Sequence, residues 1–177
     1  QVSIVDDEAN FTAGLKFFLE QEGFAAKIFS SGEEFIEAFD GDEAIQISPQ
    51  CIILDIRLGG ISGTEVFYWL KSHYPDSPYE VIFLTGHGEL PVAVNMVKRG
   101  AIDFLQKPVD SQRLLSVINS ALASAKFRYQ AFELRQIFHS RYKLLTNKEK
   151  MVMKYLLKVM SNKDIASKMD VSVRTVE

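Results

Sequence analysis

Carboxylate, hydroxyl and ammonium side chains stand at or just after the ends of four apolar segments of this chain. They belong to Asp6, Asp7, Asp55, Thr85 and Lys107. Carboxylates that lie close together repel one another unless a cation is bound between them. Mg²⁺ binds in such places through one or two carboxylates and keeps waters and phosphate oxygens as its other ligands. If the four segments are neighbouring parallel strands, these residues indicate a metal-assisted phosphoryl-transfer site.

Five short apolar segments in the first two thirds of the chain have the character of strands that are buried on both faces. They are residues 2–5, 25–29, 52–54, 81–84 and 102–105. Apolar residues spaced three and four positions apart predict amphipathic helices between them. Near-continuous apolar strands favour a parallel sheet with helices on both faces. The sequence therefore predicts an α/β fold with a five-stranded, doubly wound parallel sheet, whose ligands bind at the carboxyl ends of the strands.

The polar residues at these ends also have structural explanations. Asp6 and Asp7 are of the type that caps a helix or stabilises its first turn. Thr85 and Lys107 are ordinary residues for the end of a strand. Asp55 is harder to explain in this way, because it interrupts an apolar run and a buried carboxylate needs a partner or a metal. The equivalent position of all five favours a shared chemical role.

The composition is that of an ordinary globular protein with room for one full domain and a small second one. The 177 residues are 47% hydrophobic and 24% charged. The single cysteine, Cys51, excludes an intramolecular disulfide and a cysteine-only metal site. Because no apolar stretch reaches the roughly 18 residues of a membrane span and no leader precedes the first strand, we expect a cytoplasmic protein. Gln1 already lies in strand-like sequence, so we expect a few residues before it.

The net charge of −3 conceals an acidic front and a basic tail. Residues 1–122 hold 8 Lys and Arg against 18 Asp and Glu, a net charge of −10. Residues 123–142 hold 4 against 1, or +3, and residues 143–177 hold 8 against 4, or +4. This division predicts two domains, with the tail as the part that binds a polyanion. Lysines that only solvate a small helical unit are the alternative.

The segments that carry the polar strand ends resemble the receiver domain of two-component response regulators. The matching segments are residues 5–8, 53–57, 82–88 and 101–108. Their order and spacing fit that family, and the sequence around residues 85–88 is most similar to the FixJ type. The resemblance implies a flavodoxin-like receiver fold. It also implies that Asp55 is the phosphoacceptor, which takes a phosphoryl group from the histidine of a sensor kinase.

The same resemblance assigns the metal ligands. Asp7 and Asp55 would bind Mg²⁺ together with the backbone carbonyl of Arg57, and Asp6 would act mostly through water. These roles agree with the chemistry, because a carboxylate is a legitimate covalent nucleophile. The transferring group needs cations on its equatorial oxygens more than it needs acid–base chemistry.

Further residues would contact the phosphoryl group or respond to it. Lys107 would supply a second cation, and the Thr85 hydroxyl would donate a hydrogen bond to a phosphoryl oxygen. Phe104 matches the aromatic switch residue of the family, which turns inward when the threonine moves. The peptide bond before Pro108 is usually cis in the family. His87 and Arg57 are placed where they would set the lifetime of the phosphoryl group, although either is also an ordinary loop residue.

One loop departs from the family pattern. The family usually has a proline four residues after the phosphoacceptor, where this chain has Gly59. Glycine costs more entropy to order than other residues. We therefore expect a loose loop with weaker metal binding, and tighter Mg²⁺ binding in Gly59→Pro.

An enzymatic alternative also uses an aspartyl nucleophile at the end of a strand. Phosphohydrolases of the haloacid dehalogenase type need a second aspartate two residues after the first, where this chain has Arg57. Residues 59–63 lack the Gly-Lys-Ser/Thr of a P-loop, and the three histidines lack the spacing of a zinc site. We therefore expect no turnover of a small-molecule substrate.

Beyond residue 110 the pattern becomes helical, and neither Gly nor Pro occurs from residue 111 to 177. The fifth helix is predicted to continue as a long connector, whose apolar stripe shifts near residues 125–127. We expect its first half to pack on the sheet and its second half to form a docking or dimer surface. The predicted domains are a receiver domain at 1–122, a helical linker at 123–142 and a small all-α helix-turn-helix domain at 143–177.

The tail resembles the DNA-binding domain of the LuxR and FixJ group. The matching segments are residues 145–149, which include a capping box, 162–166 and 173–177. By this resemblance Lys163 would contact phosphate, and Thr175, Val176 and Glu177 would begin the recognition helix in the major groove. Val159 stands where the family usually has glycine. Because the chain stops one turn into that helix, we expect these 177 residues alone to bind DNA poorly.

Together these patterns predict a phosphorylation-controlled transcription factor. Its partners would be a sensor histidine kinase, promoter DNA and, after phosphorylation, a second copy of the chain. One new charged group would bias a two-state element. The alternative is a phosphorelay or protein-docking receiver whose tail binds a protein rather than DNA.

Overall fold

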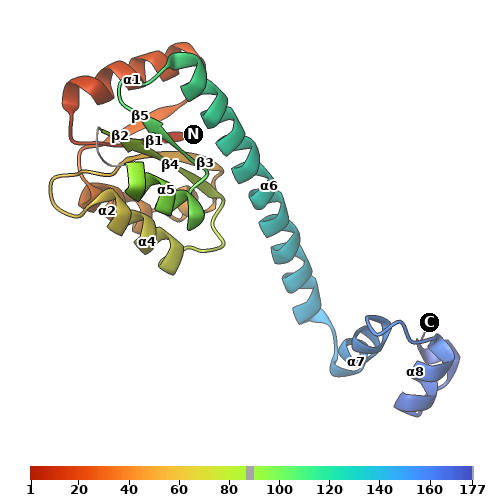
Figure 1. Cartoon of the computed structure of the whole chain (residues 1–177). Coiled ribbons are helices and arrows are strands. Elements are labelled where there is room, and N and C mark those ends of the chain that lie inside the picture. Colours follow the sequence, from red (N-terminus) through yellow and green to blue (C-terminus); the bar gives the residue numbers. More distant parts are fainter. Residues whose placement is uncertain (87–89, 177) are drawn as a thin grey trace. The chain divides into compact units, whose positions relative to one another are not determined.

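The computed structural model describes residues 1–86 and 90–176 of the chain. A five-stranded parallel sheet, in the order β2-β1-β3-β4-β5, forms the centre of the unit Gln1–Phe132 (Figure 1). The strands are β1 (Val2–Val5), β2 (Ala26–Phe29), β3 (Gln50–Asp55), β4 (Tyr79–Thr85) and β5 (Asp103–Gln106). The direction of winding reverses between β1 and β3, which makes this a doubly wound sheet. The predicted fold class is confirmed.

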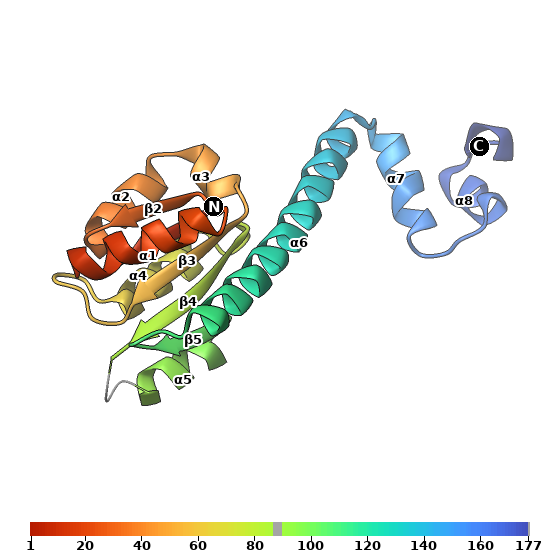
Figure 2. The same cartoon turned by 90° about the horizontal axis from the view of Figure 1, so that it is seen from above.

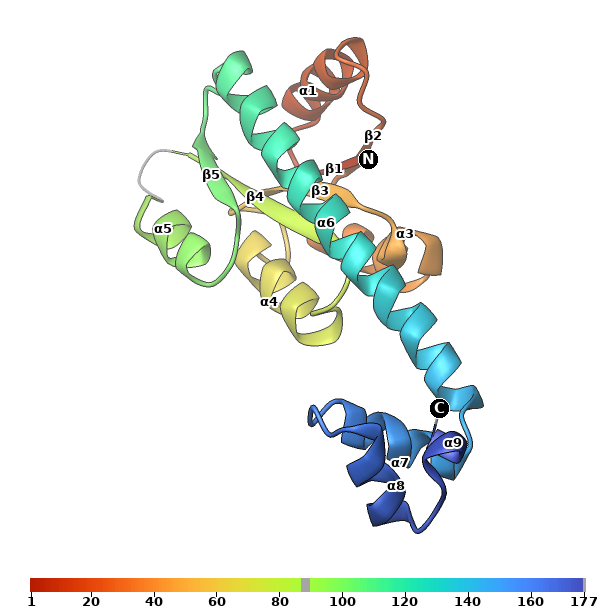
Figure 3. The ribbon, with the colours of Figure 1, turned by 90° about the vertical axis from the view of Figure 1, so that its right-hand side faces the viewer.

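Helices cover both faces of this sheet, as Figures 2 and 3 show. One face is covered by α1 (Ala9–Gln21) and by the first part of α6 (Ser111–Leu144), the other by α2 (Gly32–Asp40), α4 (Gly63–His73) and α5 (Leu90–Lys98). The sequence does not predict α3 (Glu43–Ile47), because five residues give no measurable periodicity. Among the described residues, no helix has the length and apolar character needed to cross a bilayer.

The sheet separates two apolar cores, because alternate residues of a strand point to opposite faces. In β3, Ile52 and Leu54 belong to the core under α2, α4 and α5, whereas Cys51 and Ile53 belong to the core under α1 and α6. All four side chains are fully buried. Burial of a side chain of this size stabilises the fold by about 1.5–3 kcal/mol. The unbroken apolar runs of the sequence follow from this burial on both faces.

The carboxyl ends of the strands meet at one edge of the sheet. Asp55 ends β3 beside Leu84 of β4. Asp6 directly follows β1, and Thr85 is the last residue of β4. Asp6, Asp55 and Thr85 are all buried, with exposed fractions of 1%, 6% and 1%. Buried polar side chains at one edge need partners there.

Helix α6 contributes to both compact units of the chain, which are Gln1–Phe132 and Glu133–Glu177. Its buried residues end at Ala125. Beyond this point Phe127, Leu134 and Phe138 are exposed by 73%, 67% and 56%. The packing of α6 on the sheet therefore ends near residues 125–127, where the sequence predicts the apolar stripe to shift.

The second unit holds the end of α6 and three short helices. They are α7 (Asn147–Leu156), α8 (Asn162–Met169) and α9 (Val173–Val176). The predicted capping box is present, because Thr146 Oγ1 accepts a hydrogen bond from Glu149 N at 3.3 Å and Glu149 Oε2 accepts one from Thr146 N at 2.7 Å. Ile165 and Ala166 of α8 are buried, and Asp170 turns the chain with a φ of 52°. These helices form the predicted helix-turn-helix.

Val159, in the turn that follows α7, has a backbone conformation that β-branched residues rarely adopt, with a φ of 57°. Val159 N donates to Leu156 O at 2.8 Å, and Met160 N donates to Tyr155 O at 3.3 Å. This is the hydrogen-bond pattern of a Schellman motif, in which glycine is preferred at the left-handed position. The departure from the family pattern at this residue therefore strains the backbone.

We expect Val159→Gly to raise the free energy of unfolding of the helical unit by about 1 kcal/mol, because glycine has no Cβ to strain. The Val159 side chain is 93% exposed, so its removal should cost few packing contacts. Val159→Ala keeps a Cβ and should gain less. Hydrogen exchange of the α7 and α8 amides in the whole chain measures the difference. Equal or faster exchange in the glycine variant would show that the residue is not strained.

Candidate functional site

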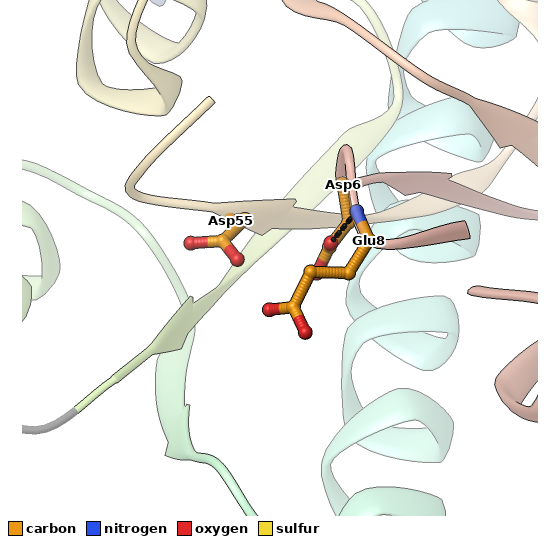
Figure 4. Close-up of side chains that lie close together, drawn as sticks. All are labelled: Asp6, Glu8 and Asp55. Atoms are coloured by element: carbon orange, nitrogen blue, oxygen red, sulfur yellow. Dashed lines mark hydrogen bonds between the residues drawn. The ribbon is translucent and has the colours of Figure 1, made fainter. Parts of the chain in front are cut away.

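Lys107 lies among three carboxylates at the edge where the strands end. Its Nζ donates hydrogen bonds to Asp55 Oδ2 at 2.5 Å, Asp6 Oδ2 at 2.7 Å and Glu8 Oε1 at 2.9 Å. Figure 4 shows Asp6, Glu8 and Asp55 close together, and one oxygen of each lies within 4.8 Å of the others. The Asp6 and Asp55 side chains are 0% and 8% exposed, whereas that of Glu8 is 63% exposed. The structure thus brings together Asp6, Asp55 and Lys107.

Burial and ion pairing act on this cluster in opposite directions. Burial raises the pKa of Asp55, although hydrogen bonds from Lys107 and from the Arg57 amide partly offset it. Burial alone would lower the pKa of Lys107, but its hydrogen bonds to Asp55, Asp6 and Glu8 outweigh burial and raise it. Lys107 is therefore an ammonium group at neutral pH. It is the cation that allows a carboxylate to be buried beside it.

A pocket of about 480 Å³ opens beside the cluster. It is lined by Asp7, Glu8, Asp55, Arg57, Leu58, Gly59, Gly86 and Lys107. Carboxylate oxygens are the ligands of hard divalent cations, which keep several waters when few carboxylates bind them. Acidic residues that reach one open pocket therefore fit a cation of this kind.

The three acidic residues at positions 6–8 have different sets of hydrogen-bond partners, and the sequence does not reveal which partners each one has. Asp6 Oδ1 accepts a hydrogen bond from Glu8 N at 2.9 Å beside its contact with Lys107. This bond does not cap α1, because the N-cap of that helix is Glu8 and no side chain caps it. Asp7 Oδ2 accepts one from Gly59 N at 3.1 Å. The third carboxylate on Lys107 is that of Glu8, which was not among the candidates. Its only sequence signal is its place directly after two aspartates.

Of the remaining candidates that the structure describes, only Arg57 lines this pocket. The Thr85 hydroxyl donates to Gly86 O at 3.0 Å. Phe104 is half-buried and packs against the core under α2, α4 and α5. The peptide bond before Pro108 is cis, as the resemblance implies. Arg57 lines the pocket with an exposed side chain, and His87 lies outside the described residues.

The loop between β3 and α4 is held by two carboxylates rather than being loose. Asp7 accepts a hydrogen bond from Gly59 N, and Glu33 Oε1 accepts one from Ile61 N at 2.9 Å. Gly60 lies between these two points with a φ of 96°. These hydrogen bonds argue against the expectation that the missing proline loosens this loop, because two of its amides have partners.

We accordingly expect Gly59→Pro to weaken Mg²⁺ binding rather than to tighten it. Proline has no N–H and would remove the hydrogen bond that orients Asp7. A loss of about threefold to tenfold in affinity corresponds to one such bond. Gly59→Ala keeps the N–H and is the control, since a Cβ there would lie 3.5 Å from Asp7 Oδ2, an ordinary contact. Calorimetric titration with Mg²⁺ measures both, and tighter binding by the proline variant would restore the entropic argument.

The residues expected to contact DNA belong to the second unit. Lys163, in the first turn of α8, and Thr175, in α9, are exposed, whereas Val176 is partly buried. Glu177 lies outside the described residues. Ser161 caps α8, since its Oγ accepts a hydrogen bond from Asp164 N at 3.2 Å. The cap orients the start of α8, where Lys163 stands.

Comparison with known proteins gives two family matches, one in the acidic first part of the chain and one in its basic tail. Residues 2–119 match the response regulator receiver domain, and residues 143–177 match the bacterial regulatory proteins of the luxR family. The transcriptional regulatory protein FixJ of Bradyrhizobium diazoefficiens is 34% identical over 176 residues, which are 99% of this chain and 82% of that protein. The tetrathionate response regulatory protein TtrR of Salmonella typhimurium is also 34% identical, over 99% of this chain and 80% of its own length.

Solved structures are similar over the same length. The response regulator StyR has a TM-score of 0.81 at 31% identity, with 99% of this chain and 85% of that chain covered. Full-length FixJ from B. japonicum has a TM-score of 0.64 at 34% identity, with 99% and 83% covered. The likeness therefore extends over both units.

Proposed function

The chain belongs to the response regulators that combine a receiver domain with a LuxR-type DNA-binding domain, and from this premise we propose that Asp55 is the residue that a sensor histidine kinase phosphorylates. Regulators of this family control transcription and are not metabolic enzymes. The observation that carries the assignment to Asp55 is its contact of 2.5 Å with Lys107 at the pocket. A buried carboxylate beside an ammonium group and an open pocket would be suited to attack a phosphoryl group.

Asp55 would act as a nucleophile, with one of its oxygens forming the bond to phosphorus as the bond to the donor breaks. The ammonium group of Lys107 would then move its hydrogen bond from the Asp55 carboxylate to a phosphoryl oxygen. Asp7, Asp55 and the backbone carbonyl of Arg57 would hold Mg²⁺, with Asp6 acting through water. When bound, that cation supplies positive charge for the phosphoryl oxygens.

Thr85 and Phe104 would transmit the effect of phosphorylation from Asp55 to the surface of the receiver domain. The Thr85 hydroxyl, which now donates to Gly86 O, would turn to a phosphoryl oxygen. Its movement would vacate space beside β4, into which the half-buried ring of Phe104 would rotate. This pair is a two-state element that one new charged group biases.

The output would be binding of promoter DNA in the cytoplasm, with dimer formation after phosphorylation. We propose a receiver domain at 1–122, a helical linker at 123–142 and a DNA-binding domain at 143–177. Lys163 would contact phosphate, and Thr175, Val176 and Glu177 would enter the major groove. The positive charges of residues 123–142 and 143–177 support DNA as the partner of the tail.

DNA footprinting of the full gene product, with and without acetyl phosphate and Mg²⁺, tests this function. We expect a protected site that appears or tightens on phosphorylation and weakens as salt is raised. Phosphorylation without any DNA protection would instead support a receiver that docks on another protein.

A further inference from the structure

The β3–α4 loop is fixed from α2 by a residue that has no role in the proposed chemistry. Glu33 lies in the first turn of α2, and its Oε1 accepts a hydrogen bond from Ile61 N at 2.9 Å. Two residues earlier in the same loop, Gly59 N donates to Asp7 Oδ2 at 3.1 Å. One short segment of backbone thus connects the Glu33 carboxylate with the carboxylate that the proposed function assigns to the cation.

Helix α2 and this loop approach each other closely. A Cβ on Gly60 would lie 2.4 Å from Glu33 Oε1 and 3.0 Å from Oε2, so the carboxylate lies directly against the Gly60 backbone. A Cβ on Gly32 would lie 2.7 Å from Ile61 Cγ1, so the first turn of α2 also lies directly against Ile61. Glycine at each of these two positions leaves room for this close approach.

The lowered pKa of Glu33 agrees with its role as an ionised hydrogen-bond acceptor for Ile61 N. The hydrogen bond from the Ile61 amide lowers the pKa of Glu33 below its ordinary value. Its place in the first turn of α2 also favours a negative charge, because the helix dipole is positive there. The carboxylate is therefore ionised and available to the loop at neutral pH.

We propose that Glu33 is a positioning residue of the phosphoryl-transfer site. Its carboxylate holds the Gly60–Ile61 peptide, which keeps Gly59 N on Asp7 and thereby sets the orientation of the carboxylate that binds Mg²⁺. In this chain the contact replaces the restraint that a proline supplies elsewhere in the family. The inference rests on the proposed function, because it concerns the cation of the same site.

The first test compares Glu33→Ala with Glu33→Gln and with Glu37→Ala in the whole chain. Glutamine keeps an acceptor oxygen for Ile61 N, whereas alanine does not. Glu37→Ala removes the same charge from an exposed position one turn further along α2. We expect Glu33→Ala to raise the dissociation constant of Mg²⁺ by about threefold to tenfold, and both other variants to stay within about twofold of the parent.

The uptake of phosphate from acetyl phosphate separates positioning from a general loss of structure. If Glu33 acts through Asp7, the Glu33→Ala variant should be slow at low Mg²⁺ and should approach the parent rate at saturating Mg²⁺. A merely structural role would lower the rate at every Mg²⁺ concentration. Hydrogen exchange at the Ile61 amide should be faster in Glu33→Ala and near the parent value in Glu33→Gln.

A double-mutant cycle with Gly60→Ala tests the contact itself. Alanine at a φ of 96° is strained in either background, so this strain cancels in the cycle. The clash with the Glu33 carboxylate exists only when Glu33 is present. We therefore expect Gly60→Ala to weaken Mg²⁺ binding less in the Glu33→Ala background than in the parent.

Three outcomes would overturn the proposal: parent-like Mg²⁺ affinity in Glu33→Ala, equal losses in Glu33→Ala and Glu33→Gln, or additive effects in the cycle. Asp55→Asn, measured in parallel, distinguishes these from a failure of the proposed function. Suppose that the parent takes up phosphate, that Asp55→Asn does not, and that Glu33→Ala behaves like the parent. In that case only the proposed role of Glu33 is wrong. If Asp55→Asn takes up phosphate normally, the proposed function itself fails.

Discussion

Asp55→Asn is expected to reduce phosphoryl uptake from acetyl phosphate by about a hundredfold or more, because an amide has no nucleophilic oxygen anion to offer. The side chain keeps its shape, and Lys107 keeps its hydrogen bonds to Asp6 and Glu8. Intact-protein mass spectrometry after incubation with Mg²⁺ and acetyl phosphate measures the uptake.

The fold should survive this substitution and gain stability at neutral pH. Burial raises the pKa of Asp55 in the folded state. A carboxyl group with a raised folded pKa costs stability above its unfolded pKa, and this cost disappears as the pH falls below that value. Asparagine carries no charge and removes the cost, so the melting temperature at neutral pH should be equal or higher.

Glu8→Gln is the matched control, since it changes another carboxylate on Lys107 to an amide. Glu8 is mostly exposed and is not assigned a covalent role, so uptake should change by no more than about threefold. Uptake by Asp55→Asn at the parent rate would mean that another side chain carries the phosphoryl group. A large loss in Glu8→Gln alone would move the chemistry toward that residue.

The fold can be predicted from the sequence because strands that are buried on both faces consist of unbroken runs of apolar residues. Residues such as Ile52 and Ile53 face opposite cores, so the apolar run has no polar interruption until Asp55. That interruption marks the sheet edge, and the strand order then brings Asp6 and Lys107 to it. Strand ends and their polar residues are therefore predictable from one-dimensional patterns.

The parts of the site that sequence reasoning missed depend on side-chain directions and on close backbone approaches. Glu8 and Glu33 stand among other acidic residues, and nothing in their spacing tells which carboxylate reaches Lys107 and which reaches a loop amide. A glycine at residue 59 suggests a free loop when only the sequence is considered. In the structure its N–H donates to Asp7 Oδ2, and no sequence pattern predicts that contact.

Gly63 is a second residue whose importance the sequence conceals. It begins α4, and its N–H donates to Ile56 O at 3.1 Å, which draws the helix against the end of β3. A Cβ at this position would lie 1.9 Å from Asp55 O and 2.9 Å from Asp55 C. These are backbone atoms of the proposed phosphoacceptor, so they cannot turn aside as a flexible side chain does.

Gly63→Ala should therefore destabilise the receiver unit by about 3 kcal/mol and lower phosphoryl uptake at temperatures where the fold persists, because α4 or Asp55 must move. Gly14→Ala is the matched control: Gly14 lies inside α1 with nothing within 4 Å of its Cβ position, so the same substitution should stabilise by about 0.5–1 kcal/mol. The single tryptophan, Trp69 in α4, reports unfolding by its fluorescence. Equal melting temperatures and equal uptake in the two variants would show that α4 can withdraw from Asp55 without cost.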